Sequence, residues 1–125
     1  MDNVVLVLVL LFTKHFVVDF PLQRPYQLMN KGTYGHPGGI FHAELHAVFT
    51  YLCFSWYFPT LSVILALVDG IIHYHVDWLK VKINNRYGWT VEQPQYWALF
   101  GFDQFIHALT YIIMVFVAFK EFYYA

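Results

Sequence analysis

Charged residues are scarce in this chain of 125 residues. Asp, Glu, Lys and Arg make up 12% of it, against about 25% in an average soluble domain. Hydrophobic residues make up 59% and aromatic residues 22%. A soluble domain of this length has too high a surface-to-volume ratio to bury so much apolar surface. The scarcity of charge therefore argues against an ordinary soluble domain and predicts an integral membrane protein that contacts the lipid bilayer.

Other absences narrow the function further. The net charge is −1 and no Lys/Arg run occurs, so a nucleic-acid partner is not expected. The single cysteine, Cys53, excludes a disulfide within the chain. The sequence contains no phosphate-binding P-loop, no nucleophile elbow and no H-E-x-x-H motif. Any chemistry must come from residues that the fold brings together.

Four long apolar segments are present instead. A helix that crosses ~30 Å of hydrocarbon needs ~20 mostly apolar residues, and residues 4–20, 40–58, 61–79 and 96–119 meet this requirement. Open strands cannot face lipid, so the segments are expected to be helices. The first segment follows an acidic start, "MDNVV", and is expected to be a retained span. The predicted fold is all-α: one domain, residues 1–125, with four transmembrane helices in an antiparallel bundle.

Basic residues predict the orientation of these spans. Five of the six Lys and Arg residues considered in the loops and at the end of the chain fall in two loops on the same side: Arg24, Lys31, Lys80, Lys82 and Arg86. The opposite side has only Lys120. Positive charge favours the cytoplasmic side. We therefore expect both long loops in the cytoplasm and both termini outside, in a bacterial inner membrane.

Each apolar segment carries a pair of ionisable residues four positions apart. The pairs are His15 and Asp19, His42 and His46, His73 and Asp77, and Asp103 and His107. Residues at this spacing share one face of a helix. Chance predicts about two such pairs in the chain, and it has five when Asp69 with His73 is included. All four segments place their pairs within about two turns of the cytoplasmic boundary, which indicates one shared site.

Rotation around the third helix separates the residues of "DGIIHYHVDWLK" (69–80). At ~100° per residue, Asp69, His73 and Asp77 share a face, with Lys80 beside them. His75 points to the opposite side and is not expected in the site. In the first segment, Lys14 lies off the face of His15 and is expected to snorkel to the interface or to face a neighbouring helix.

Imidazole and carboxylate groups are the ligands of Zn, Fe and Mn sites. The predicted metal ligands are His15, Asp19, His42, His46, His73, Asp77, Asp103 and His107. They suffice for one or two divalent ions, with Zn²⁺ as first choice and Fe or Mn as alternatives. A metal-bound water would make the protein a hydrolase of a membrane-associated substrate, with Asp69 or another unligated aspartate as general base.

Three other interpretations use the same residues. The pairs can hold the helices together without any metal. They can form a pathway for divalent cations or protons, which would make the protein a transporter or channel. The protein can also act as a phage or host accessory protein through contacts with a membrane protein partner or as a homo-oligomer.

Four short motifs occur in a fixed order along the chain: "HFVVDFPLQ", "FHAELHA", "HYHVDWLK" and "FDQFIHAL". Together they resemble a small integral-membrane family of bacteria and their phages that is known only as a domain of unknown function. This resemblance covers nearly the whole chain and implies a four-helix membrane protein without an established activity. The histidine-rich helix ends are also distantly similar to those of inner-membrane metal-dependent hydrolases, although the arginine-rich segment of those proteins is missing.

Overall fold

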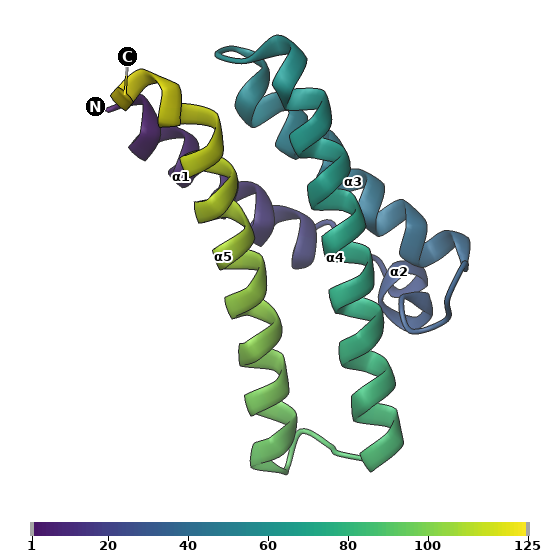
Figure 1. Cartoon of the computed structure of the whole chain (residues 1–125). Coiled ribbons are helices and arrows are strands. Elements are labelled where there is room, and N and C mark those ends of the chain that lie inside the picture. The colour runs from purple at the N-terminus through teal and green to yellow at the C-terminus, as the bar shows by residue number, and fades with distance from the viewer. Residues whose placement is uncertain (1, 125) are drawn as a thin grey trace.

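The computed structural model describes residues 2–124, with side chains as far as Lys120. It contains five helices: α1 (Asn3–Asp19), α2 (Pro25–Asn30), α3 (Pro37–Ser55), α4 (Pro59–Tyr87) and α5 (Pro94–Tyr124) (Figure 1). No strand occurs among the residues described. The all-α prediction is therefore confirmed, and each of the four predicted helices is present.

Several helices extend beyond the residues predicted to span the membrane. α3 begins before residue 40 because Pro37 occupies its first turn and the His36 ring accepts a hydrogen bond from the Gly38 N–H. α4 does not end at residue 79 but continues to Tyr87, and Gly88 ends it in the left-handed conformation (φ 65°). The short helix α2 was not predicted, because six residues after a proline are too few to show a helical hydrophobic pattern.

The four long helices form a closed ring. α3 and α4 pack along each other across a short turn, α1 contacts α3 and α5, and α4 contacts α5. α2 packs against α3. Figure 1 shows that α4 and α5 are antiparallel and extend past the ends of α1 and α3 towards the connection at residues 88–93. The interior of the ring is therefore bordered by all four helices.

Two of the helices, α4 and α5, are long and apolar enough to cross a membrane by length and composition. α1 has 17 residues and α3 has 19, and they are not among these candidates. The predicted fold had four transmembrane helices, and the structure agrees in being all-helical with two helices that qualify as spans. Two of the four predicted spans, α1 and α3, are therefore not shown by length and composition.

The interior of the ring changes character along its length. One end is an apolar core of Val7, Leu11, Cys53, Phe54, Leu65, Tyr111, Met114, Val115, Ala118 and Phe119. The part nearer the two long connections is filled by buried lysine, aspartate, histidine and glutamine. Large apolar side chains are instead exposed on the outside of the ring, such as Phe16, Leu67, Ile71 and Phe116 at about 60%. The outside of the ring is therefore apolar, whereas its interior is apolar at one end and polar at the other.

Gly38 allows α2 to lie close to α3. A Cβ atom at this position would lie 2.6 Å from the backbone oxygen of Tyr26. We expect Gly38→Ala to destabilise the protein by about 1–3 kcal/mol, because the backbone must shift to relieve this contact. Gly101→Ala is the matched control: among the residues described, no atom beyond its own helix lies within 4 Å of the added Cβ.

Because alanine favours a helix, Gly101→Ala is expected to raise the stability by about 0.5–1 kcal/mol. Unfolding of both variants in one detergent measures the difference. Equal stability of Gly38→Ala and the unaltered chain would contradict the close packing of α2 on α3.

Candidate metal centre

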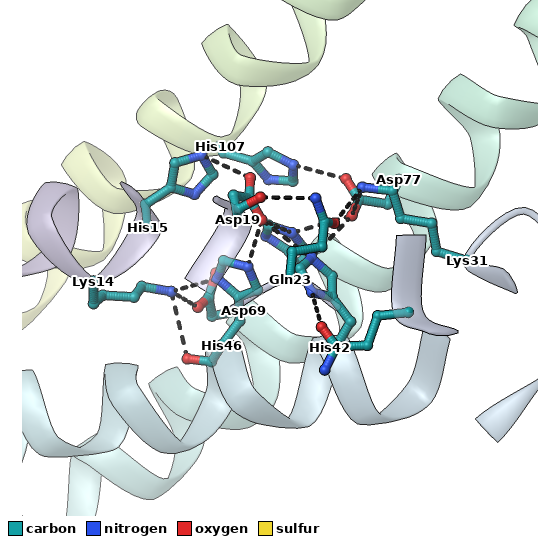
Figure 2. A network of polar contacts seen from close by, with 12 residues as sticks. Lys14, His15, Asp19, Gln23, Lys31, His42, His46, Asp69, Asp77 and His107 are labelled. Carbon is teal, nitrogen blue, oxygen red and sulfur yellow. Dashed lines mark hydrogen bonds and ion pairs between the residues drawn. The ribbon is translucent and has the colours of Figure 1, made fainter. Parts of the chain in front are cut away.

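All eight predicted ligands lie at the polar part of the ring interior, and each long helix contributes two of them. His15 and Asp19 come from α1, His42 and His46 from α3, His73 and Asp77 from α4, and Asp103 and His107 from α5. Seven of the eight are buried, and His15 is partly buried. Figure 2 shows how side chains from separate helices point towards one another. The i, i+4 spacing thus placed every pair on an inward face.

The first group surrounds Asp19. Its Oδ1 atom lies 2.8 Å from Nε2 of His46, 3.1 Å from Nε2 of His42 and 3.4 Å from Nε2 of His73. Three helices therefore direct one carboxylate and three imidazole nitrogens at a common point. These four residues can hold a metal ion, since one ligand atom from each lies within 4.8 Å of the others.

The second group comprises His73, Asp77 and His107, and it too can hold an ion. The two Asp77 oxygens lie 3.3 Å from Nε2 of His73 and 3.3 Å from Nε2 of His107. The ring of His73 stacks on the rings of both His46 and His107, with centroids 3.5 and 3.9 Å apart. His73 belongs to both groups and is the centre of the cluster.

Two ring nitrogens are close to carboxylates without a hydrogen bond. Nε2 of His42 and Nε2 of His73 are buried and unsatisfied, although each lies 3.1–3.4 Å from carboxylate oxygens. Burying a polar nitrogen without a partner costs ~1–3 kcal/mol. Zinc ligands at ~2.0–2.1 Å in a tetrahedral site are separated by about 3.3 Å, which matches these N···O distances. A cation at the centre would satisfy both nitrogens.

His15 and Asp103 lie at the edge of the cluster. His15 contacts the Tyr111 hydroxyl at 2.9 Å, the Gln104 side-chain oxygen at 2.8 Å and Asp19 at 3.1 Å. Asp103 lies 3.0 Å from Nε2 of His107. Neither belongs to the two groups whose ligand atoms converge. Their positions suit residues that orient the converging ligands.

Asp69 lies deeper in the ring, in a buried ion pair with Lys14. The Lys14 Nζ atom is 2.7 Å from Asp69 Oδ2, and the Thr50 hydroxyl donates to the same oxygen at 2.6 Å. Lys14 is only 4% exposed, so the expectation that it snorkels to the interface was wrong. The alternative expectation, that it faces a neighbouring helix, is confirmed by its contact with Asp69 of α4. Lys14 continues the buried stripe of Val7 and Leu11, because positions 7, 11 and 14 share one face.

Lys14 also connects Asp69 to the first group. Its Nζ atom lies 3.1 Å from Nδ1 of His46. When the charged lysine donates to this nitrogen, Nε2 of His46 carries the ring proton and donates to Asp19 at 2.8 Å. A metal ion that binds Nε2 of His46 needs the other neutral tautomer, with the ring proton on Nδ1, so Lys14 then no longer donates to that nitrogen. Asp69 and Lys14 thus act on the first group through His46.

Two further lysines contact the cluster from the side of the long connections. Lys31 donates to Asp77 at 3.2 Å and to the Gln23 side-chain oxygen at 3.0 Å (Figure 2). Lys80 donates to Asp103 at 2.8 Å. Helical rotation had placed Lys80 beside the site. The burial of Lys31 was not predicted, because this residue follows the short helix α2, which shows no helical pattern in the sequence.

Other site residues could have been found from spacing alone. Thr50 comes four positions after His46, and Tyr111 comes four positions after His107, so each continues a predicted stripe. His75, which rotation excluded, is exposed and contacts Tyr34 and the backbone of its own helix.

The fold and the site define an all-α protein with buried His/Asp groups that can hold a metal ion and with two helices suited to cross a membrane. The chain belongs to the family described as "Protein of unknown function (DUF3307)", whose model matches residues 7–124. No curated protein and no solved structure matches the chain. The resemblance to a family of unknown function is thereby confirmed, and the likeness to metal-dependent hydrolases gains no support.

Proposed function

We propose that this protein spans the membrane four times, binds one or two divalent metal ions at the His/Asp cluster, and hydrolyses a membrane-associated substrate at the cytoplasmic face. The observation that carries the proposal is the convergence of His42, His46 and His73 on Asp19, with buried ring nitrogens that lack a hydrogen bond. Zn²⁺ is the first choice of metal, since nitrogen and carboxylate ligands in a group of four are typical of it; Fe and Mn are the alternatives.

The distribution of polarity supports four spans. α1 and α3 bury the polar groups of the cluster and expose apolar side chains such as Val9, Phe16, Val48 and Leu52. An exposed apolar surface on all four long helices requires lipid or protein to cover it. Ionisable residues within spans almost always face the bundle interior, as they do here. The bilayer is the proposed partner of this surface.

Hydrolysis follows from what a bound divalent ion supplies. When bound at these residues, such an ion would polarise an ester oxygen and would lower the pKa of a water molecule towards ~7. The chain's own residues bind and orient the ion, and the aspartates at the edge of the cluster accept protons. Asp103 is better placed than Asp69 for this role. Asp69 is enclosed by Lys14 and Thr50, whereas Asp103 accepts a hydrogen bond from Gln104, which lines a cavity.

Transport is the alternative, and the interior favours it less. A pathway for ions needs polar groups along the whole ring. Beyond Asp69 the interior is occupied by the apolar core that includes Leu11, Phe54 and Tyr111. Asp69 is thus the last buried carboxylate on this side among the residues described. A site that opens to one face suits an enzyme rather than a channel.

The experiment compares hydrolysis with flux in the same liposomes. We expect protein loaded with Zn²⁺ to release product from a lipid ester or lipid-linked substrate and a chelator to abolish the release. We expect no uptake of Zn²⁺ or of protons above the background of empty liposomes. Metal uptake that depends on the protein, without any hydrolysis in a screen of lipid substrates, would contradict the proposed hydrolase function and support transport.

A further inference from the structure

A cavity of about 180 Å³ lies beside the cluster, on the side of the long connections. Asp19 forms part of its wall and links it to the first ligand group. Its polar lining consists of two lysines and three amides: Lys31, Lys80, Gln23, Asn84 and Gln104. The remaining wall is apolar and aromatic: Phe20, Leu28, Val81, Tyr96, Leu99 and Phe100. The cavity is therefore amphipathic.

The charge of the cluster depends on the metal. With neutral histidines, its four aspartates and three lysines leave one negative charge; these residues are Asp19, Asp69, Asp77, Asp103, Lys14, Lys31 and Lys80. One divalent ion changes this to one positive charge, and two ions change it to three. Once metal is bound, the site therefore carries an excess of positive charge that an anion can neutralise.

Two of the three lysines line the cavity, where such an anion can reach them. Lys31 and Lys80 are held in place by Asp77 and Asp103, at 3.2 and 2.8 Å. Each ammonium group has three N–H donors. A lysine of this kind binds phosphate as a fixed point charge. Gln23 and Gln104 also line the cavity, and each amide donates one hydrogen bond within the chain, to Asp19 and Asp103, and keeps a second N–H for a ligand.

The size and the apolar wall indicate what carries the anion. The cavity is smaller than the ~300–1,000 Å³ of pockets that enclose drug-sized ligands. It suits a headgroup rather than a whole lipid. Phe20 and Leu28 of its wall are about half exposed at the outer surface, where an acyl or prenyl chain attached to the headgroup can lie in the bilayer.

We propose that this cavity binds the phosphate group of a phosphate-bearing lipid, with Lys31 and Lys80 as its anchors and the metal centre at its inner end. The inference rests on the proposed function, because the excess positive charge arises only when metal is bound. It narrows the substrate to a phosphate ester whose lipid chain stays in the membrane. Inorganic phosphate offers the same group without the chain.

The test counts phosphatidic acid and phosphatidylcholine molecules retained by the Zn²⁺-loaded full chain in native mass spectrometry from detergent. We expect one phosphatidic acid per chain in preference to phosphatidylcholine. Lys80→Gln is expected to lower its occupancy about tenfold, the effect of one lost charged hydrogen bond. Lys82→Gln is the matched control, because this substitution removes the same charge from a lysine that lies outside the cavity, over the ring of Trp78.

A second variant changes no charge. Leu99→Trp fills the cavity and is expected to prevent lipid retention, whereas Ala98→Trp places the same ring on an exposed neighbouring position and is expected to retain it. Removal of the metal by a chelator is expected to weaken retention. If inorganic phosphate is retained with the same sensitivity to Lys80→Gln and phosphatidic acid shows no preference, the phosphate subsite stands and its source is free phosphate.

Metal content is measured on the same samples, which separates the two proposals. Stoichiometric metal together with equal retention of phosphatidic acid and phosphatidylcholine, and no retained inorganic phosphate, would overturn the phosphate subsite and leave the metal centre intact. Absence of metal from the unaltered chain would overturn the proposed function itself.

Discussion

His73→Ala is expected to weaken metal binding, with an apparent affinity at least 10–100-fold below that of the unaltered chain, the loss that even the removal of a residue hydrogen-bonded to a ligand can cause. His73 is the residue that both ligand groups share. Its Nε2 atom lies 3.4 Å from Asp19 and 3.3 Å from Asp77. Its removal takes one ligand from each group at once, which leaves three ligands in the first group and two in the second. Metal analysis after purification and titration with Zn²⁺ measure the loss.

His75→Ala is the matched control for this variant. His75 lies two positions further along the same helix, is exposed, and contacts Tyr34 and the Ile71 carbonyl. Both variants remove an imidazole from α4, but only His73 faces the cluster. We expect His75→Ala to retain the full metal content. An equal loss of metal in both variants would mean that the effect is not specific to the cluster.

Lys14→Met is expected to destabilise the protein by about 3–5 kcal/mol, because it leaves a buried carboxylate without its partner. Lys14 and Asp69 are 2.7 Å apart, and their side chains are 3% and 1% exposed. Asp69→Leu is expected to cost a similar amount, since it leaves the buried ammonium group unpaired. Reversible unfolding of the protein in a single detergent provides the free energies.

The double variant Lys14→Met/Asp69→Leu distinguishes a paired charge from two independent effects. Replacing both members of a buried ion pair by apolar residues is often nearly neutral. We therefore expect the double variant to be more stable than either single variant. Glu44→Gln, an exposed carboxylate on α3, is expected to change the stability little. Additive losses in the double variant would show that Lys14 and Asp69 do not stabilise the fold as a pair.

Periodicity predicted the helices and most of the cluster. The i, i+4 spacing placed His42 with His46 and Asp103 with His107 on inward faces, because a helix repeats every 3.6 residues whatever its tertiary contacts. The same spacing excluded His75, which is exposed. A buried polar stripe in an apolar helix is a strong signal, since burial of each charge must be compensated.

The partners of these residues could not be predicted from the same pattern. Lys14 was predicted to lie off the face of His15. It is buried because it lies on the same face of α1 as the buried residues Val7 and Leu11. Lys31 directly follows the short helix α2, which packs on α3, and its ammonium group contacts Asp77 of α4. Which carboxylate pairs with which lysine depends on how the four helices are rotated and shifted against one another, and no single segment encodes that.

The metal content of the purified protein tests most directly whether the His/Asp cluster holds a metal ion. We predict one or two equivalents of a divalent transition metal, with Zn²⁺ first, in the unaltered chain. His42→Ala and His107→Ala, each of which removes a ligand from one group, are predicted to lower that content. No metal in the unaltered chain, with unchanged folding of both variants, would contradict the account.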